Sequence, residues 1–276
     1  MFEIKHSKQS DSFFNPDCLN RFLISQFYKL ITTYYSNLYI CKMPTKEEVK
    51  NYYDNTFKDY QKKVGINIRH RTIFKNLKKE GLTRQSNVLE IGCGIGSVSH
   101  IILKYITEGS FVGLDISPES IKTAQALHSF HKKAEFLVND MSDFSHTTKF
   151  DFVVFPDVLE HIPVEQHAHI FETISKLTTP NAVVLINIPE PNHLNWMRIH
   201  EPEKLQIIDQ ALSMQDLINN SYPFGFKLAS MHSYQLHYTV ADYTSIVLKK
   251  NMEVKQAGMM PYLKRGIESF LAKLLG

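Results

Sequence analysis

The stretch Val88-Leu89-Glu90-Ile91-Gly92-Cys93-Gly94-Ile95-Gly96-Ser97 decides the fold of this 276-residue chain. Its first four residues are typical of a short buried strand, and a helical pattern begins at Ser97. Between them stand glycines at alternate positions, which let the backbone turn tightly and leave room for a ligand to touch the main chain. A strand-to-helix turn without any ligand uses the same glycines, so this stretch alone leaves both interpretations open.

Outward from this stretch, short apolar runs alternate with helical patterns. Strands that alternate with helices form right-handed β-α-β units, which build a parallel sheet covered by helices on both faces. The sequence therefore predicts an α/β fold with a doubly wound, mostly parallel, seven-stranded sheet. Candidate strands lie at Val88–Ile91, Phe111–Leu114, Glu135–Val138, Phe152–Phe155, Val183–Ile188, Lys227–His237 and Tyr243–Lys249, and candidate helices at Ser97–Thr107, Pro118–His131 and Val164–Leu177.

Additional helices are predicted before the core and within it. Thr45 and Glu48 form a capping-box pattern, and the helical patterns that follow end before the first candidate strand. We expect residues 1–80 to form an N-terminal helical extension or lid and residues 81–250 to form the core. A long helical insertion, at about 190–225, is expected to follow the fifth strand as a helical lid.

The last segment, residues 251–276, carries an apolar helical face with lysines and an arginine opposite it. Such an amphipathic helix docks on the protein itself, on a second subunit of a homodimer, or weakly on a membrane surface. The pattern does not distinguish these three docking surfaces.

Acidic side chains mark the ends of two neighbouring candidate strands. The second strand ends in Asp115, where a carboxylate can accept both hydroxyls of a ribose, and the third runs into Asp140-Met141. Because open α/β sheets bind ligands at the carboxyl ends of their strands, we expect one crevice to hold these residues and the glycines. Ser97 replaces the third glycine of the dinucleotide fingerprint, and Glu90 would repel a pyrophosphate. A cofactor that carries an ammonium and a sulfonium fits better.

Four motifs within residues 87–190 resemble those of class I, Rossmann-like methyltransferases that use S-adenosyl-L-methionine. The resemblance is to the broad group that contains ubiquinone-biosynthesis and natural-product methyltransferases, and it covers the middle of the chain. The motifs are Val88–Gly96, Gly113-Leu114-Asp115-Ile116-Ser117, Asn139-Asp140-Met141, and Phe150–Val154 followed by Asp157-Val158-Leu159-Glu160-His161-Ile162-Pro163.

The resemblance implies S-adenosyl-L-methionine as the cofactor and gives each motif a part of it. The implied contacts are Glu90, Gly92, Cys93, Gly94 and Gly96 for the methionine moiety, Asp115 for the ribose, Ile116, Asp140 and Met141 for the adenine, and the turn Phe155-Pro156-Asp157 beside the amino-acid end. Tyr60 is similar to a tyrosine on a helix that closes over the cofactor in many relatives, although Phe57 stands where a small residue is usual.

Methyl transfer from a sulfonium is an in-line displacement, so the protein mainly has to position the acceptor and exclude water. A hydroxyl acceptor also has to lose a proton. His161 is the candidate base because its turn follows the fourth strand and faces the crevice; the alternative is that it only supports the following helix. Candidates for acceptor binding in the insertion, each of which also fits a surface or packing role, are Asn192, His193, Trp196 and His200.

Composition narrows the class of protein. The chain is 43% hydrophobic and 21% charged, as in ordinary globular proteins. Three scattered cysteines, and the lack of a signal-peptide or membrane-span pattern, favour the cytoplasm. We expect no metal, because no carboxylate and histidine set has ligand spacing, and no nucleic-acid partner, because no RNA-binding module is found.

The function predicted from these features is S-adenosyl-L-methionine-dependent methylation of a small-molecule or saccharide acceptor, at oxygen. One alternative is a quinone or lipid-linked acceptor at a membrane surface. Another is a non-catalytic regulatory protein that binds the cofactor and lacks an acceptor pocket.

Overall fold

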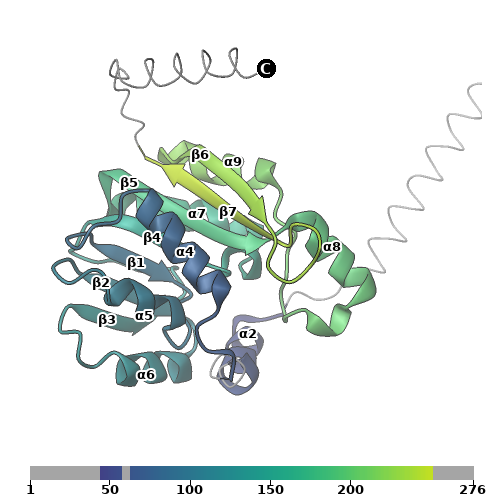
Figure 1. Cartoon of the computed structure of the whole chain (residues 1–276), viewed down its shortest axis with the longest axis horizontal. Coiled ribbons are helices and arrows are strands. Elements are labelled where there is room, and N and C mark those ends of the chain that lie inside the picture. Colours follow the sequence, from purple (N-terminus) through teal and green to yellow (C-terminus); the bar gives the residue numbers. More distant parts are fainter. Residues whose placement is uncertain (1–43, 58–62, 251–276) are drawn as a thin grey trace, which may run out of the picture. The chain divides into compact units, whose positions relative to one another are not determined.

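A mixed sheet organises the part of the chain that is described, which comprises residues 44–57 and 63–250 of a computed structural model. All that follows concerns the unit that begins at Lys46. Seven strands of the described residues lie in the order β3-β2-β1-β4-β5-β7-β6 (Figure 1). Strands β1 to β5 are parallel, and β7 runs antiparallel to both β5 and β6. The mostly parallel α/β fold predicted from the sequence is confirmed.

The elements follow the predicted alternation. The strands are β1 (Val88–Ile91), β2 (Phe111–Asp115), β3 (Ala134–Val138), β4 (Phe150–Pro156), β5 (Thr178–Pro189), β6 (Lys227–Tyr234) and β7 (Tyr243–Lys249). The α-helices are α2 (Lys46–Tyr52), α4 (Ile68–Lys79), α5 (Ser97–Leu103), α6 (Pro118–Leu127), α7 (Val164–Leu177), α8 (Pro191–His200) and α9 (Met214–Ser221). The short helices are the π-helix η1 (Tyr53–Phe57) and the 3₁₀ turns η2 (Leu159–His161), η3 (Pro202–Lys204) and η4 (Tyr222–Phe224).

Helices bury both faces of the sheet. Ile73 of α4 and Ile102 of α5 belong to one hydrophobic cluster, and Figure 1 shows these two helices crossing in front of the strands. Phe171 of α7 and Leu217 of α9 belong to the cluster on the other face. Helix α4 therefore contributes to the core although it precedes residue 80. The boundary between an N-terminal extension and the core at residue 80 stays a prediction.

The centre of the sheet creates the crevice. β1 pairs with β2 on one side and with β4 on the other, so the connections that leave their carboxyl ends diverge to opposite faces. Ligands of open α/β sheets bind at such a point. It brings the loop after β1, the end of β2 and the turn after β4 to one edge.

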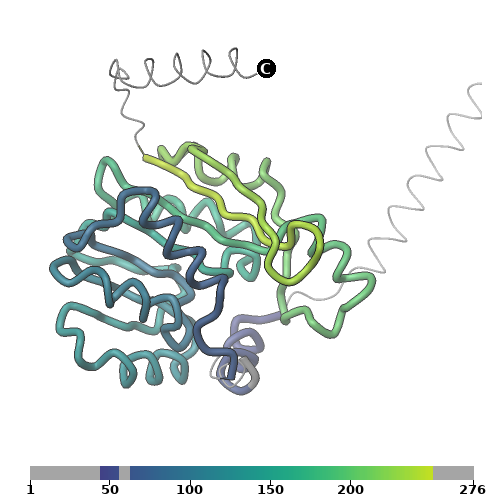
Figure 2. Tube along the Cα trace, viewed as in Figure 1, coloured from purple at the N-terminus to yellow at the C-terminus, as the bar shows by residue number. Residues whose placement is uncertain are grey.

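The insertion after β5 differs from the single long helical segment expected at about 190–225. Helix α8 ends at His200 because Pro202 has no amide hydrogen and disfavours a helical residue before it. An irregular stretch, residues 205–213, follows before α9; Figure 2 shows this part of the chain leaving the sheet after β5 and returning to it at β6. The backbone of Gln210 donates to the carbonyl of Glu160 at 2.9 Å, which fixes the irregular stretch to the turn after β4.

The predicted terminal helices fall outside the described residues. This holds for residues 1–43, for the amphipathic segment at 251–276 and for Tyr60. Their predicted roles therefore stay predictions.

Candidate active site

The glycine loop after β1 is shaped by close packing. Gly92 has a φ of +74°, and a Cβ on it would lie 2.2 Å from Cγ2 of Val158. Gly96, with a φ of +88°, would bring a Cβ within 2.7 Å of Nε2 of His128. Side chains are excluded at both positions by backbone conformation and by space. The Cys93 side chain is buried in the core, so this residue can offer only its backbone to a ligand.

Glu90 is a fully buried carboxylate at the centre of β1. Its Oε2 accepts a hydrogen bond from Ser99 Oγ at 2.7 Å, whereas Oε1 has no hydrogen-bond partner among the described residues. Burial raises the pKa of Glu90 to about 8, against the opposing effect of the Ser99 hydrogen bond. An unpaired buried carboxylate is costly, and a cationic ligand would relieve the cost. The ammonium of S-adenosyl-L-methionine therefore fits this position.

Asp115, at the end of β2, is held by the glycine loop. Its Oδ2 accepts from the amide of Gly94 at 2.8 Å, and its Oδ1 accepts from the amide of Ser117 at 2.9 Å. Burial raises the pKa of Asp115 to about 6, although both amides favour the charged form. Each oxygen keeps a second lone pair for a ligand donor. The neighbouring Ile116 is half-buried.

The end of β3 brings Asp140 and Met141 beside this carboxylate pocket. Asp140 Oδ2 lies 2.6 Å from the Lys46 ammonium of α2, and Oδ1 accepts from the amide of Ser142. Burial raises the pKa of Asp140, but these hydrogen bonds outweigh it and lower the pKa to about 2. Met141 has a φ of +69°, and its side chain is packed in the core. Whether Met141 also covers an adenine ring stays a prediction.

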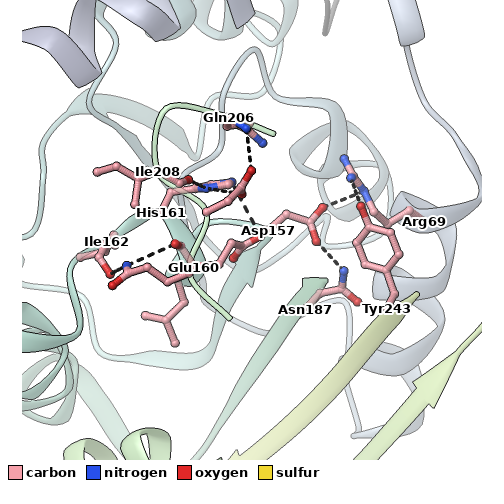
Figure 3. A network of polar contacts seen from close by, with 12 residues as sticks. Arg69, Asp157, Glu160, His161, Ile162, Asn187, Gln206, Ile208 and Tyr243 are labelled. Atoms are coloured by element: carbon pink, nitrogen blue, oxygen red, sulfur yellow. Dashed lines mark hydrogen bonds and ion pairs between the residues drawn. The ribbon is translucent and has the colours of Figure 1, made fainter. Parts of the chain in front are cut away.

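The turn after β4 carries an ion pair that the sequence analysis missed (Figure 3). Arg69 Nε of α4 lies 2.7 Å from Asp157 Oδ2, and Asn187 of β5 donates to Asp157 Oδ1 at 2.7 Å. Asp157 has a φ of +59°, which turns the chain back over the end of the strand. The preceding Phe155 is fully buried, so at this turn Phe155 can offer a ligand only its backbone.

Next to this pair, Glu160 and His161 form a buried ionisable pair. His161 Nδ1 hydrogen-bonds to the carbonyl of Ile208 at 2.5 Å and lies 3.2 Å from Asp209 Oδ1. His161 Nε2 lies 3.7 Å from Glu160 Oε1. Neither Nε2 nor the two carboxylate oxygens of Glu160 have a hydrogen-bond partner among the described residues. Figure 3 shows the Glu160 side chain between His161 and Asp157.

The charges around His161 set its protonation. Burial lowers the pKa of this imidazole, but Glu160 and Asp209 outweigh burial and raise the pKa to about 9. Burial raises the pKa of Glu160, and the charge of His161 opposes this rise. At neutral pH the imidazole of His161 is therefore mainly protonated. It loses its proton near pH 9, whereas an ordinary histidine does so near neutrality.

Tyr53 of η1 covers the pair from the N-terminal side. Its ring centroid lies 6.4 Å from that of His161, and its hydroxyl donates to Gln206 Oε1 at 3.2 Å. The neighbouring Asp54 accepts a hydrogen bond from Ser117 Oγ at the N-terminus of α6. The short helix thus joins the end of β2 to the irregular part of the insertion.

The predicted acceptor residues of α8 form a separate aromatic group. His193 is buried, its ring lies 4.3 Å from that of Tyr238, and neither ring nitrogen has a hydrogen-bond partner among the described residues. Trp196 is 41% exposed and stacks on His200 at 4.5 Å. Asn192 donates to Glu190 Oε1. Within residues 44–57 and 63–250 these side chains contact one another, Glu190 and Tyr238, and their role in acceptor binding stays a prediction.

The described residues contain neither a cluster of metal ligands nor a helix that could span a membrane. No group of three or more histidine, cysteine or acidic side chains is arranged there to hold a metal ion. None of their helices is long and apolar enough to cross a bilayer.

Comparison with known proteins gives a match to a methyltransferase domain. A model described as a methyltransferase domain matches residues 89–184. Malonyl-[acyl-carrier protein] O-methyltransferase 1 of Ilyobacter polytropus is 34% identical over 73 residues, which cover 26% of this chain and 27% of that protein. Ribosomal RNA large subunit methyltransferase E of Brachyspira hyodysenteriae is 30% identical over 125 residues, 42% of this chain and 60% of that protein. The chain thus spans less than two thirds of the length of these relatives.

Solved structures agree with the fold. Magnesium protoporphyrin IX methyltransferase of Synechocystis PCC 6803, with bound SAH, has a TM-score of 0.60 and 18% identity. The match covers 75% of this chain and all of that one. Residues 89–184 thus match a methyltransferase domain, and the fold around them is similar to that of class I, Rossmann-like methyltransferases.

Proposed function

We propose that the protein transfers a methyl group from S-adenosyl-L-methionine to an oxygen of a small-molecule or saccharide acceptor. The observation that carries the proposal is a pair of buried polar groups without hydrogen-bond partners among the described residues: Glu90 Oε1 in β1, just before the glycine loop, and His161 Nε2 in the turn after β4. The first suits the cation of the cofactor, and the second, in the unprotonated imidazole, suits a proton donor on the acceptor.

The residues of the cofactor site have complementary tasks. Glu90 pairs with the ammonium, and the backbone around Gly92 and Gly94 leaves space for the methionine moiety. Asp115 accepts from the ribose, and Asp140 accepts from the adenine amino group. When bound, the cofactor supplies a methyl group on a positively charged sulfur, which is already an activated leaving group. Arg69 is an additional candidate for a carboxylate contact because its guanidinium lies at the same turn, paired with Asp157.

His161 is the candidate base, and its surroundings set the conditions. Ile208 and Asp209 hold Nδ1, which leaves Nε2 as the nitrogen that can take the acceptor proton. Because the pKa of His161 is raised to about 9, its base form becomes populated only as the pH rises toward that value. The ring of Tyr53 near His161, and its hydrogen bond to Gln206 in the irregular stretch 205–213, support the lid role that we propose for these segments.

The test is a turnover assay with pools of hydroxyl-bearing metabolites and saccharides. The cofactor carries a ¹³C-methyl group, and the products are examined by mass spectrometry and by the chemical shift of the transferred methyl. An O-methyl resonance that disappears with Asp115→Ala supports the proposal. An N-methyl or C-methyl product would contradict the oxygen assignment, and tight cofactor binding without turnover across all pools would indicate a regulatory protein.

A further inference from the structure

A cavity of about 220 Å³ lies beside the candidate active site and is not used by the proposed chemistry. Its floor is formed by inward side chains of β5 and β7, and α9 covers it on the face that this helix shares with α7 (Figure 1). Leu159, the first residue of η2, closes one end and is followed directly by Glu160 and His161. Met231 of β6, which is 47% exposed, lies at the outer end.

The lining is aliphatic. Ile186, Ile188, Leu212, Leu217 and Ile246 are each less than a tenth exposed and present only hydrocarbon to the cavity. No aromatic side chain of the described residues lines it. Protein interiors are packed with few voids, and apolar cavities of about 150 Å³ bind a molecule as large as benzene. By proportion, the space corresponds to about nine carbon atoms.

The polar residues of the lining are already hydrogen-bonded to one another or to neighbours. Thr244 pairs with Ser233 at 2.9 Å, and Ser213 with Asp216 at 2.6 Å. Glu190 accepts from the amide of His193 at 2.8 Å and from the Asn192 side chain. A buried water needs two to four polar partners, so this cavity offers little to water.

The charge at the rim selects the ligand further. Glu190 belongs to the lining, and Asp216 lies beside Ser213, whereas among residues 44–57 and 63–250 no lysine or arginine lines the cavity. An anionic head group at the entrance would be repelled. We propose that the cavity is a binding site for the unbranched alkyl chain of an amphiphile whose head group carries no negative charge. The site does not depend on the proposed methyl transfer, and its occupant contacts the turn that carries His161.

Two methionines make the binding directly measurable. Met214 and Met231 line the cavity, whereas Met141 and Met197 do not. In the full-length protein, whose nine methionines are labelled with ¹³C at the methyl groups, 1-octanol should produce saturable shifts at Met214 and Met231 and leave Met141 and Met197 unchanged. Octanoate, with the same chain and a negative head, should bind at least tenfold more weakly.

Two variants fill the cavity at different places. Leu217→Phe reduces its volume from the helix side, and Met231→Trp blocks it at the exposed end, where folding is less affected. Each should weaken octanol binding at least tenfold while cofactor affinity is kept; Leu127→Phe, at a position 54% exposed on α6, is the matched control. Absence of saturable shifts, shifts of Met141 and Met197 as large as those of Met214 and Met231, or unchanged binding in a folded cavity-filling variant would overturn the proposal. Equal binding of octanoate would overturn the assignment of the head group.

Discussion

Glu90→Gln should weaken cofactor binding and remove its dependence on pH. Glutamine keeps an oxygen that can accept from Ser99, so the buried hydrogen bond survives, but it cannot provide the negative charge for an ammonium. A charge-assisted hydrogen bond is about twice as strong as a neutral one, so the loss is about 1–2 kcal/mol, or about 5–30-fold in the dissociation constant.

The pH dependence follows from the raised pKa. In the ligand-free protein Glu90 has a pKa of about 8, so at neutral pH it is mainly protonated and has to release a proton when a cation binds. Cofactor affinity of the wild type should therefore fall as the pH is lowered from 7.5 to 6, by about tenfold per unit, equivalent to about 1.4 kcal/mol. In this range the α-amino group of the cofactor stays mainly protonated.

Isothermal titration calorimetry across this pH range measures both effects, and two buffers of different ionisation enthalpy count the released proton. Glu135→Gln, which removes a carboxylate that is 59% exposed on β3, is the control and should behave as the wild type. If Glu90→Gln binds the cofactor as tightly as the wild type, or keeps the same pH slope, then Glu90 does not meet the ammonium.

Further predictions concern the ribose contact, the base, the lid and the stability. Asp115→Ala should weaken cofactor binding by about 1.5–3 kcal/mol in calorimetry, with the fold intact by circular dichroism; an unchanged dissociation constant would mean that another group holds the ribose. His161→Ala should lower turnover of a hydroxyl acceptor about 10²–10⁴-fold, and the wild-type rate should rise with pH toward about 9; a variant that retains most of its turnover would leave His161 a supporting role. Deleting residues 1–43 should reduce turnover more than cofactor affinity, whereas normal turnover of the truncated protein would exclude a lid role for this segment. Because burial raises the pKa of Glu160 above its ordinary 4.5, the free energy of unfolding should fall as the pH rises above about 4.5, and Glu160→Gln should flatten this slope in urea titrations.

The cofactor side of the site could be predicted because it depends on local backbone chemistry. The spacing of Gly92 and Gly96 encodes left-handed backbone positions, and Asp115 stands at the end of a strand that apolar periodicity reveals. The motif sets the position of each residue along the chain, and the parallel sheet brings these positions to one edge.

The surroundings of His161 could not be predicted in the same way. Asp209 lies 48 positions further along the chain and reaches His161 only because the insertion is irregular there. Arg69 stands in an amphipathic helix, where a basic residue is usual on the solvent side, and only the packing of α4 on the sheet turns it toward Asp157. Such pairs are set by tertiary packing and carry no periodic signal. The raised pKa of His161, and with it the pH range of the proposed base, follows from these distant partners.

The contact between Lys46 and Asp140 has a thermodynamic consequence for any nucleoside that enters the site. A hydrogen-bond donor aimed at Asp140 has to share this carboxylate with an ammonium 2.6 Å away, or displace it. A nucleoside at the adenine position then competes with Lys46 for Asp140. Its binding opposes the attachment of the first turn of α2 to the end of β3. Higher salt, which screens a lysine that is 65% exposed, weakens the attachment and favours the nucleoside. Helix α2 would thus act as an internal competitor that the nucleoside releases on entry.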